Sequence, residues 1–418
     1  MQNPWATLSK SMRNFLALPE SPPTSASHTG QNLIAIALPL LATYVAVTAN
    51  VKPIDVAAIA IGITIISFLV LEIFWRKAHL HADAGLQHNH NICPRRIGFK
   101  LLALSVTLAL ISTLYWLLPE YGKKLYKPFF DLLAGYAWIY FVLAPVYIAV
   151  LDAFLQEPND LYARIGRRLA GKKEKFSGGE LKNYALGWAV KAFFLPLMFT
   201  FLVQHITGIQ KTEGIQQNAL SVMFGIDVMI ATAGYLMTLR LLGTHIRSAD
   251  PTAMGWIAAL ACYPPFNSII MADYLGYRRL LDPIGIGAES IFIEFLVEFM
   301  SLLSITIYTL ATAAFGIRFS NLTNRGIITG GPYRYIKHPA YVAKNAFWWF
   351  EVITRLPEGF LSGIRAILMM TGVSVIYWVR AKTEEWHLAN DPAYIEYCRW
   401  IEENGLLARL RGRSNNNG

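Results

Sequence analysis

The sequence predicts an all-α, polytopic integral membrane protein with about ten transmembrane helices. The first observation is composition: of 418 residues, 54% are hydrophobic and only 15% are charged, whereas soluble domains carry about 25% charged residues. The second is that the apolar residues form blocks of about 20, the length that a helix needs to cross a bilayer. The third is that Cys93, Cys262 and Cys398 lie far apart without a CxxC spacing. That spacing indicates neither a disulfide framework nor a thiolate zinc site.

Most of the predicted spans are plain apolar blocks. Seven of them are expected at residues 32–50, 54–75, 98–118, 132–155, 184–205, 219–242 and 288–316. The block 253–271 is weaker because Pro264 and Pro265 interrupt it. The last two segments, 344–357 and 359–379, predict a tight hairpin whose first helix is short for a full span. The expected count is therefore about ten, to within about two.

The charge distribution predicts the orientation. The most basic loops are Arg76–Lys100 and Arg164–Lys182, and cytoplasmic loops of membrane proteins are the ones enriched in Lys and Arg. We therefore expect a multi-pass protein of the cell (inner) membrane with both termini in the cytoplasm. The formal net charge of +10 reflects this orientation and not nucleic-acid binding. Residues 1–31 are polar and lack the apolar segment of a cleaved signal peptide.

A change of character near residue 250 predicts two regions. Residues 1–250 form an N-terminal transmembrane region to which no motif assigns a role. It is expected to form a lipid-facing wall that shapes substrate access, or to dock a partner. Residues 251–418 are more polar and aromatic, and they contain the candidate chemistry.

Polar side chains are unusually dense in the loop 323–345. Gly330, Gly331 and Pro332 predict a turn. The hydrogen-bonding side chains around that turn are Tyr333, Arg334, Tyr335, His338 and Tyr341. A basic, aromatic loop beside a membrane is by itself more typical of interfacial anchoring.

A second polar segment follows the last apolar helix. On a continuing helix, Arg380 and Glu384 are neighbours at i and i+4, and Glu385 is turned about 100° further round the axis. Two acids alone would indicate a solvated helix start. The short hairpin between the two polar segments predicts instead that they meet at one face of the membrane.

Together these segments resemble a known family. The strings GPYRYIKHPAYVA, EEWHL and DPAYIEYC are similar to the isoprenylcysteine carboxyl methyltransferase (ICMT) family over roughly residues 290–402. Membrane methyltransferases that act on phospholipid amines share parts of the pattern. This sequence departs from it at Lys337, where the family usually has Arg, and at Ala343, where it usually has Gly. The first change keeps the charge but loses the planar fork of Arg.

The resemblance implies that residues 251–418 form an ICMT-like helical methyltransferase core with a cytoplasmic site for S-adenosyl-L-methionine. The residues implied in cofactor binding are Gly326, Ile327, Ile328, Tyr333, His338, Pro339, Ala340, Tyr341 and Glu384. Arg380 would bind the substrate carboxylate, and Glu385 would be the second essential acid. No metal is implied.

The chemistry of methyl transfer suits these residue types. Transfer from a sulfonium is an in-line displacement, so the protein mainly supplies position and electrostatics. A carboxylate acceptor is already ionised at pH 7 and needs only a cation to hold it. An amine acceptor would need a base, for which Glu385 or His338 is a candidate.

These residues give a first hypothesis and two alternatives. The first is a membrane methyltransferase acting on a lipid-like or lipid-anchored acceptor, in particular a prenylcysteine carboxylate. The alternatives are a phospholipid N-methyltransferase and a non-enzymatic transporter. A transporter is disfavoured because the polar residues gather at one end of the helices instead of following a path across the bilayer. Membrane lipids are expected as surroundings in each case.

Other polar features of the sequence are less specific for a functional site. The residues His79, His81, His88, His90 and Cys93 share one loop, but their spacing is not that of a compact metal site, and a solvated loop is favoured. Glu294 and Glu298 lie on one helical face. They are expected to line the substrate entrance or to meet an Arg of the C-terminal region, with helix packing as the alternative. Lys191 and Asp227 are expected to form a structural salt bridge.

Overall fold

A computed structural model of the chain describes residues 22–87, 92–211, 214–267, 291–353 and 360–415. It is almost entirely helical, as the sequence predicts. The helices are α2 (Thr29–Thr48), α3 (Pro53–Val70), α4 (Pro94–Leu117), α5 (Lys127–Phe154), α6 (Leu161–Leu169), α7 (Gly178–Lys211), α8 (Ile215–Leu236), α9 (Ala253–Leu260), α10 (Ile291–Phe315), α11 (Pro339–Ile353), α12 (Phe360–Leu388), α13 (Pro392–Asn404) and α14 (Leu406–Asn415). Two short strands, β1 (Ser248–Ala249) and β2 (Thr323–Asn324), pair antiparallel.

Eight helices in the described part of the chain are long and apolar enough to cross a membrane. The protein is therefore an integral, multi-pass membrane protein. The count is lower than the expected ten because of the two segments that the sequence marks as weak. Helix α9 ends at Leu260, ahead of Pro264 and Pro265, and α11 has only 15 residues. At 1.5 Å per residue, α11 is about 22 Å long and too short for a hydrocarbon core of about 30 Å.

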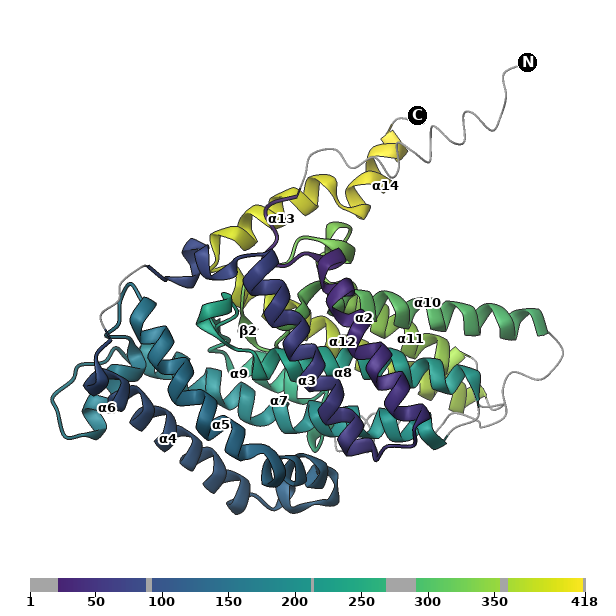
Figure 1. The fold of residues 1–418 in the computed structure, drawn as a ribbon. Coiled ribbons are helices and arrows are strands. Elements are labelled where there is room, and N and C mark those ends of the chain that lie inside the picture. Colours follow the sequence, from purple (N-terminus) through teal and green to yellow (C-terminus); the bar gives the residue numbers. More distant parts are fainter. Residues whose placement is uncertain (1–21, 88–91, 212–213, 268–290, 354–359, 416–418) are drawn as a thin grey trace.

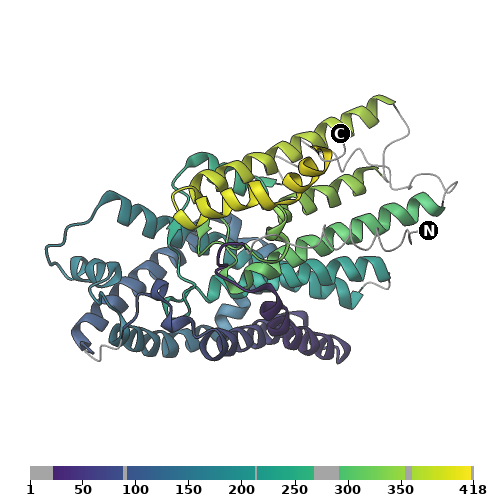
Figure 2. The same cartoon turned by 90° about the horizontal axis from the view of Figure 1, so that it is seen from above.

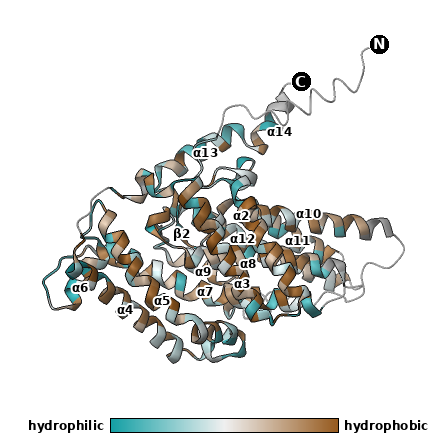
Figure 3. Cartoon of the chain, in the orientation of Figure 1, coloured by the Kyte–Doolittle hydropathy of each residue, from teal (hydrophilic) through white to brown (hydrophobic). Residues whose placement is uncertain are grey.

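The helices divide into two groups in space. In both views, α4, α5 and α6 lie on the side of the molecule away from α10, α11 and α12 (Figure 1 and Figure 2). Helices α4 and α5 are mostly apolar along their length, whereas polar residues gather on α6 and α13 (Figure 3). This distribution is typical of spans whose outer faces contact lipid.

The core between the two groups forms where α3, α7 and α8 pack together. The residues buried there include Val56, Ala57 and Ala60 of α3 and Phe194 of α7, and all four have no exposed surface. Small side chains on α3 allow its backbone to approach its neighbours closely.

The predicted salt bridge between Lys191 and Asp227 is wrong. Asp227 on α8 instead accepts hydrogen bonds from the hydroxyl groups of Tyr308 (2.7 Å) and Thr312 (2.7 Å) on α10. The Lys191 ammonium lies 4.3 Å from the centre of the Trp188 ring. Two hydroxyl donors can hold a buried carboxylate without a cation directly beside it.

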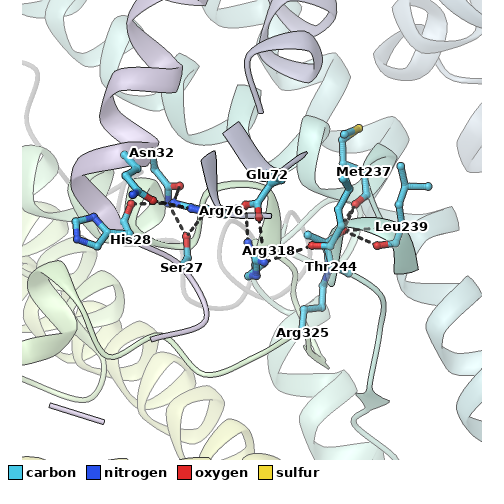
Figure 4. Close-up of polar contacts among 12 residues, drawn as sticks. Ser27, His28, Asn32, Glu72, Arg76, Met237, Leu239, Thr244, Arg318 and Arg325 are labelled. Carbon is cyan, nitrogen blue, oxygen red and sulfur yellow. Dashed lines mark hydrogen bonds and ion pairs between the residues drawn. The ribbon is translucent and has the colours of Figure 1, made fainter. Parts of the chain in front are cut away.

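A buried ionic cluster joins the N-terminal helices to the end of α10 (Figure 4). Glu72, which has no exposed surface, accepts from Arg318 at 2.7 Å and from Arg76 at 2.6 Å. Arg76 also donates to the side-chain oxygen of Asn32 (2.9 Å) on α2. The division of the chain near residue 250 stays a prediction, and these contacts cross it.

Arg325 fixes the loop that follows α10. Its guanidinium donates to the backbone carbonyls of Thr244 (2.7 Å), Phe319 (2.8 Å) and Gly234 (3.0 Å), so it satisfies the C-terminal end of α8. Figure 4 shows Arg325 beside Thr244. Burial, together with the nearby Arg318 cation, lowers the pKa of Arg325 to about 9. The loop that leads into the polar segment is thus anchored on residues of the N-terminal region.

Replacing Glu72 by Ala is expected to destabilise the protein strongly. The change leaves two arginines in a buried cluster without their carboxylate, and breaking a buried pair in this way costs about 3–5 kcal/mol. Thermal unfolding in detergent should show a clearly lower midpoint. The control is Glu120→Ala, which removes an acid from an ion pair whose Lys123 is 61% exposed and should change little. Equal midpoints for the two variants would contradict this role of the cluster.

Candidate active site

A pocket opens where the end of α10, the start of α11 and the last turns of α12 meet. Its empty volume is about 960 Å³, which includes space open to solvent. Along α10 and the segment after it, Tyr308, Thr312, Phe315 and Phe319 line it. The α10 part of this lining, from Tyr308 to Phe315, covers about 10 Å along the helix axis.

The pocket brings together many of the predicted site residues. Those that line it are Tyr333, His338, Ala340, Tyr341, Arg380 and Glu384. They come from the loop 323–345 and from α12, so the hairpin formed by α11 and α12 does place the two polar segments side by side. The other predicted residues, Gly326, Ile327, Ile328, Pro339 and Glu385, do not belong to its lining.

The segment Gly326–Ile328 lies behind the pocket wall. Ile327 and Ile328 are buried in an apolar cluster with Tyr333 and with aromatic residues of α13. The Ile327 carbonyl accepts from the backbone N–H of Ala26 at 2.9 Å. Gly326 has φ +109°, and a Cβ there would lie 2.6 Å from that of Ala26. The glycine is therefore required by its conformation and by the close approach of the N-terminal segment.

The two adjacent acids have different partners, as the helical rotation between them predicts. Glu384 accepts a hydrogen bond of 2.5 Å from the Tyr341 hydroxyl and faces the pocket. Glu385 lies 3.0 Å from the Nε2 atom of His338 and 2.7 Å from the Lys382 ammonium. Two cationic or polar partners hold Glu385 in place, and it orients the imidazole that lines the pocket.

Arg380 is buried and held by neighbours other than Glu384. Its guanidinium donates to the side-chain oxygen of Asn321, and it lies 5.0 Å from the Tyr341 ring centre and 5.6 Å from that of Tyr263. Stacking on aromatic faces fixes the plane of an Arg side chain. The remaining N–H groups of Arg380 can therefore be presented to an anion in the pocket.

Tyr333 closes another part of the wall. It is 8% exposed, and its carbonyl accepts from the Tyr397 hydroxyl of α13 at 2.7 Å. Burial, with a smaller contribution from the Glu384 carboxylate, raises the pKa of Tyr333 well above its usual value. The phenol stays neutral and is available as a hydrogen-bond donor.

Several lining residues are not among the predicted site residues. They include Asp250, Tyr263, Asn321, Lys344, Tyr377 and His387. Asp250 reaches the pocket because the pairing of β1 with β2 continues into a hydrogen bond of 2.8 Å from its N–H to the Leu322 carbonyl. Strands of two residues have no periodicity that a sequence pattern could display. His387 is oriented by a contact of 2.9 Å between its Nε2 atom and the Ser248 hydroxyl of β1.

The remaining polar features stay apart from the pocket lining. Within the described ranges, no group of three His, Cys, Asp or Glu side chains is arranged to hold a metal ion; His88 and His90 of the histidine loop lie outside those ranges. Glu298 is exposed on α10, and the side chain of Glu294 lies outside the described residues. Their expected role at the substrate entrance stays a prediction.

Comparison with known proteins identifies this part of the chain. Residues 292–390 match the model of the isoprenylcysteine carboxyl methyltransferase (ICMT) family. This region is an ICMT-family methyltransferase domain. The match contains Glu384, His338 and the other predicted site residues. Neither a curated protein nor a solved structure matches the chain.

Enzymes of the ICMT family use S-adenosyl-L-methionine, and the protein is accordingly a methyltransferase that depends on this cofactor. The pocket of the ICMT-family domain fits such a molecule chemically. The cofactor carries a cationic sulfonium, an ammonium group, a carboxylate and an aromatic base. The lining offers the acids Glu384 and Asp250, the cations Arg380 and Lys344, and several tyrosine rings.

Proposed function

We propose that the protein methylates the carboxylate of a prenylated cysteine at the cytoplasmic edge of the membrane. The observation that supports this acceptor most directly is the buried Arg380, which lines the pocket without a carboxylate partner among its described contacts. A guanidinium in this situation suits an anionic ligand, which it can bind with two hydrogen bonds. A prenyl chain attached to that anion can lie among the membrane spans.

The proposed reaction needs no proton transfer. A bound cofactor would supply its methyl group to an oxygen of the acceptor carboxylate, and the electron pair of the broken carbon–sulfur bond would stay on sulfur. The products are a methyl ester and a neutral thioether. Arg380 holds the carboxylate in line, Glu384 with Tyr341 holds the polar end of the cofactor, and the aromatic walls exclude water. When bound, the cofactor supplies the activated methyl group.

Each predicted residue has a role in this proposal. Tyr333 and the segment His338–Tyr341 wrap the cofactor, and the segment Gly326–Ile328 supports the wall from behind. Glu385 keeps His338 in its orientation through their contact of 3.0 Å. Residues 251–418 would be the catalytic region, and residues 1–250 would support it. We place both termini in the cytoplasm, with the protein in the cell (inner) membrane.

The direct test compares two acceptors. Detergent-purified protein is incubated with cofactor carrying a labelled methyl group and with either N-acetyl-S-farnesylcysteine or phosphatidylethanolamine. We expect label on the farnesylcysteine as a methyl ester, which mild alkali releases as labelled methanol. N-methyl groups resist this treatment. Alkali-stable label on the phospholipid, without ester formation, would favour the phospholipid N-methyltransferase and contradict the proposal.

A further inference from the structure

The pocket lining contains a second cation besides Arg380. Lys344 is on α11, three residues beyond Tyr341, and it lines the pocket together with Tyr308 of α10 and Tyr377 of α12. Glu384, Asp250 and His387 line the opposite part, near the last turn of α12 and the β1–β2 pair. Lys344 and Glu384 thus belong to different parts of the lining, with Tyr341 between them.

The surroundings of Lys344 hold its ammonium group without neutralising it directly. Its Nζ atom donates to the Tyr308 hydroxyl at 3.4 Å and lies 4.8 Å from the centre of that ring. It is also 5.9 Å from the centre of the Phe224 ring. Among the described residues, no carboxylate forms an ion pair with it. A charged group that is partly buried is expected to have a counter-charge or a ligand.

Asp227 supplies the counter-charge for Lys344 through the Tyr308 hydroxyl. The Tyr308 hydroxyl donates its proton to Asp227 at 2.7 Å, which leaves its oxygen free to accept from Lys344. The Thr312 hydroxyl donates to the other Asp227 oxygen at 2.7 Å. The chain of contacts from Lys344 through Tyr308 to Asp227 therefore holds the ammonium group at the pocket wall.

The charges of the two reactants match those of the lining. The acceptor brings a carboxylate, and the lining offers two cations for it, Arg380 and Lys344. Beyond Lys344, α11 continues into an apolar cluster that contains Ile305 and Phe347, with Trp348 and Phe224 packed against it. A cation at the border of a polar pocket and an apolar cluster suits an amphipathic acid with its tail in the membrane.

We infer that Lys344 is a specificity-determining residue that binds the acceptor's anionic group together with Arg380, which lines the same pocket. The inference rests on the proposed function. It assigns to α8 of the N-terminal region a part in the site, because Asp227 holds Tyr308 and so holds Lys344. Residues 1–250 then contribute to acceptor selection and not only to the membrane anchor.

The test measures binding directly, so that the answer does not depend on turnover. Full-length protein in detergent, saturated with S-adenosylhomocysteine, is titrated with N-acetyl-S-farnesylcysteine and with its neutral carboxamide. Lys344→Gln should weaken binding of the acid about tenfold or more, the loss expected for one charged hydrogen bond. It should change binding of the amide less than about twofold, and Lys344→Arg should restore most of the preference for the acid.

Controls separate a specific effect from a folding defect. Lys173→Gln, which removes a cation from an exposed loop position, should match the wild type for both ligands. Unchanged binding of S-adenosylhomocysteine shows that the Lys344 variants are folded. Equal losses for acid and amide would assign Lys344 to packing and overturn the inference, as would no loss for either. Binding of the acid without ester formation would contradict only the proposed reaction.

Discussion

Replacing Glu384 by Ala is expected to abolish binding of S-adenosylhomocysteine at micromolar concentrations. Glu384 is the acid from the paired motif that faces the pocket, and the 2.5 Å hydrogen bond from Tyr341 fixes its direction. A hydrogen bond to a charged group contributes about 1.5–3 kcal/mol, and several donors of the cofactor can share one carboxylate. Loss of the carboxylate should therefore weaken binding by at least about a hundredfold, as measured by calorimetric titration of purified protein.

Two comparisons make this result specific. Glu396→Ala removes an acid from an exposed position on α13 and should leave binding unchanged. His338→Ala removes a second lining residue from the other polar segment and should also weaken binding strongly. Wild-type affinity in Glu384→Ala, in a variant that unfolds at the normal temperature, would show that the cofactor does not contact this acid.

This part of the site can be predicted from the sequence because the residues that form it lie close together along the chain. The spacing of Arg380, Glu384 and Glu385 on a helix determines which of them share a face. In the structure, Glu384 contacts Tyr341 and Glu385 contacts His338. The spans follow from the length of apolar blocks. The two exceptions, α9 and α11, are short for reasons that the sequence also contains, namely paired prolines and too few apolar residues.

The rest of the pocket depends on contacts between distant segments. Asn321 meets Arg380, and Asp250 reaches the pocket through two-residue strands. Neither contact produces a periodic pattern in the sequence, because each depends on how loops pack on the ends of helices. The same holds for Asp227. The sequence predicts Lys191 on the neighbouring span as its partner. In the structure, two hydroxyl groups of α10 donate to the Asp227 carboxylate instead.

Replacing Arg380 by Lys is expected to impair use of the acceptor far more than binding of the cofactor. The guanidinium donates to Asn321 and is stacked beside Tyr341 and Tyr263, so its plane is fixed and further N–H groups remain for a carboxylate. Lys keeps the charge, but its compact ammonium cannot keep the Asn321 contact and also present two parallel donors. The value of kcat/KM for farnesylcysteine should fall roughly 10- to 100-fold.

The same substitution elsewhere on α12 provides the control. Arg365→Lys changes an exposed position of the same helix and should leave kcat/KM unchanged. In Arg380→Lys, the dissociation constant of S-adenosylhomocysteine should stay within about threefold of the wild-type value, because the cofactor's polar end is held by Glu384. Equal losses in cofactor binding and acceptor use would contradict the division of labour proposed for these two residues. Arg380 would then belong to the cofactor site, and Lys344 would remain as the candidate cation for the acceptor.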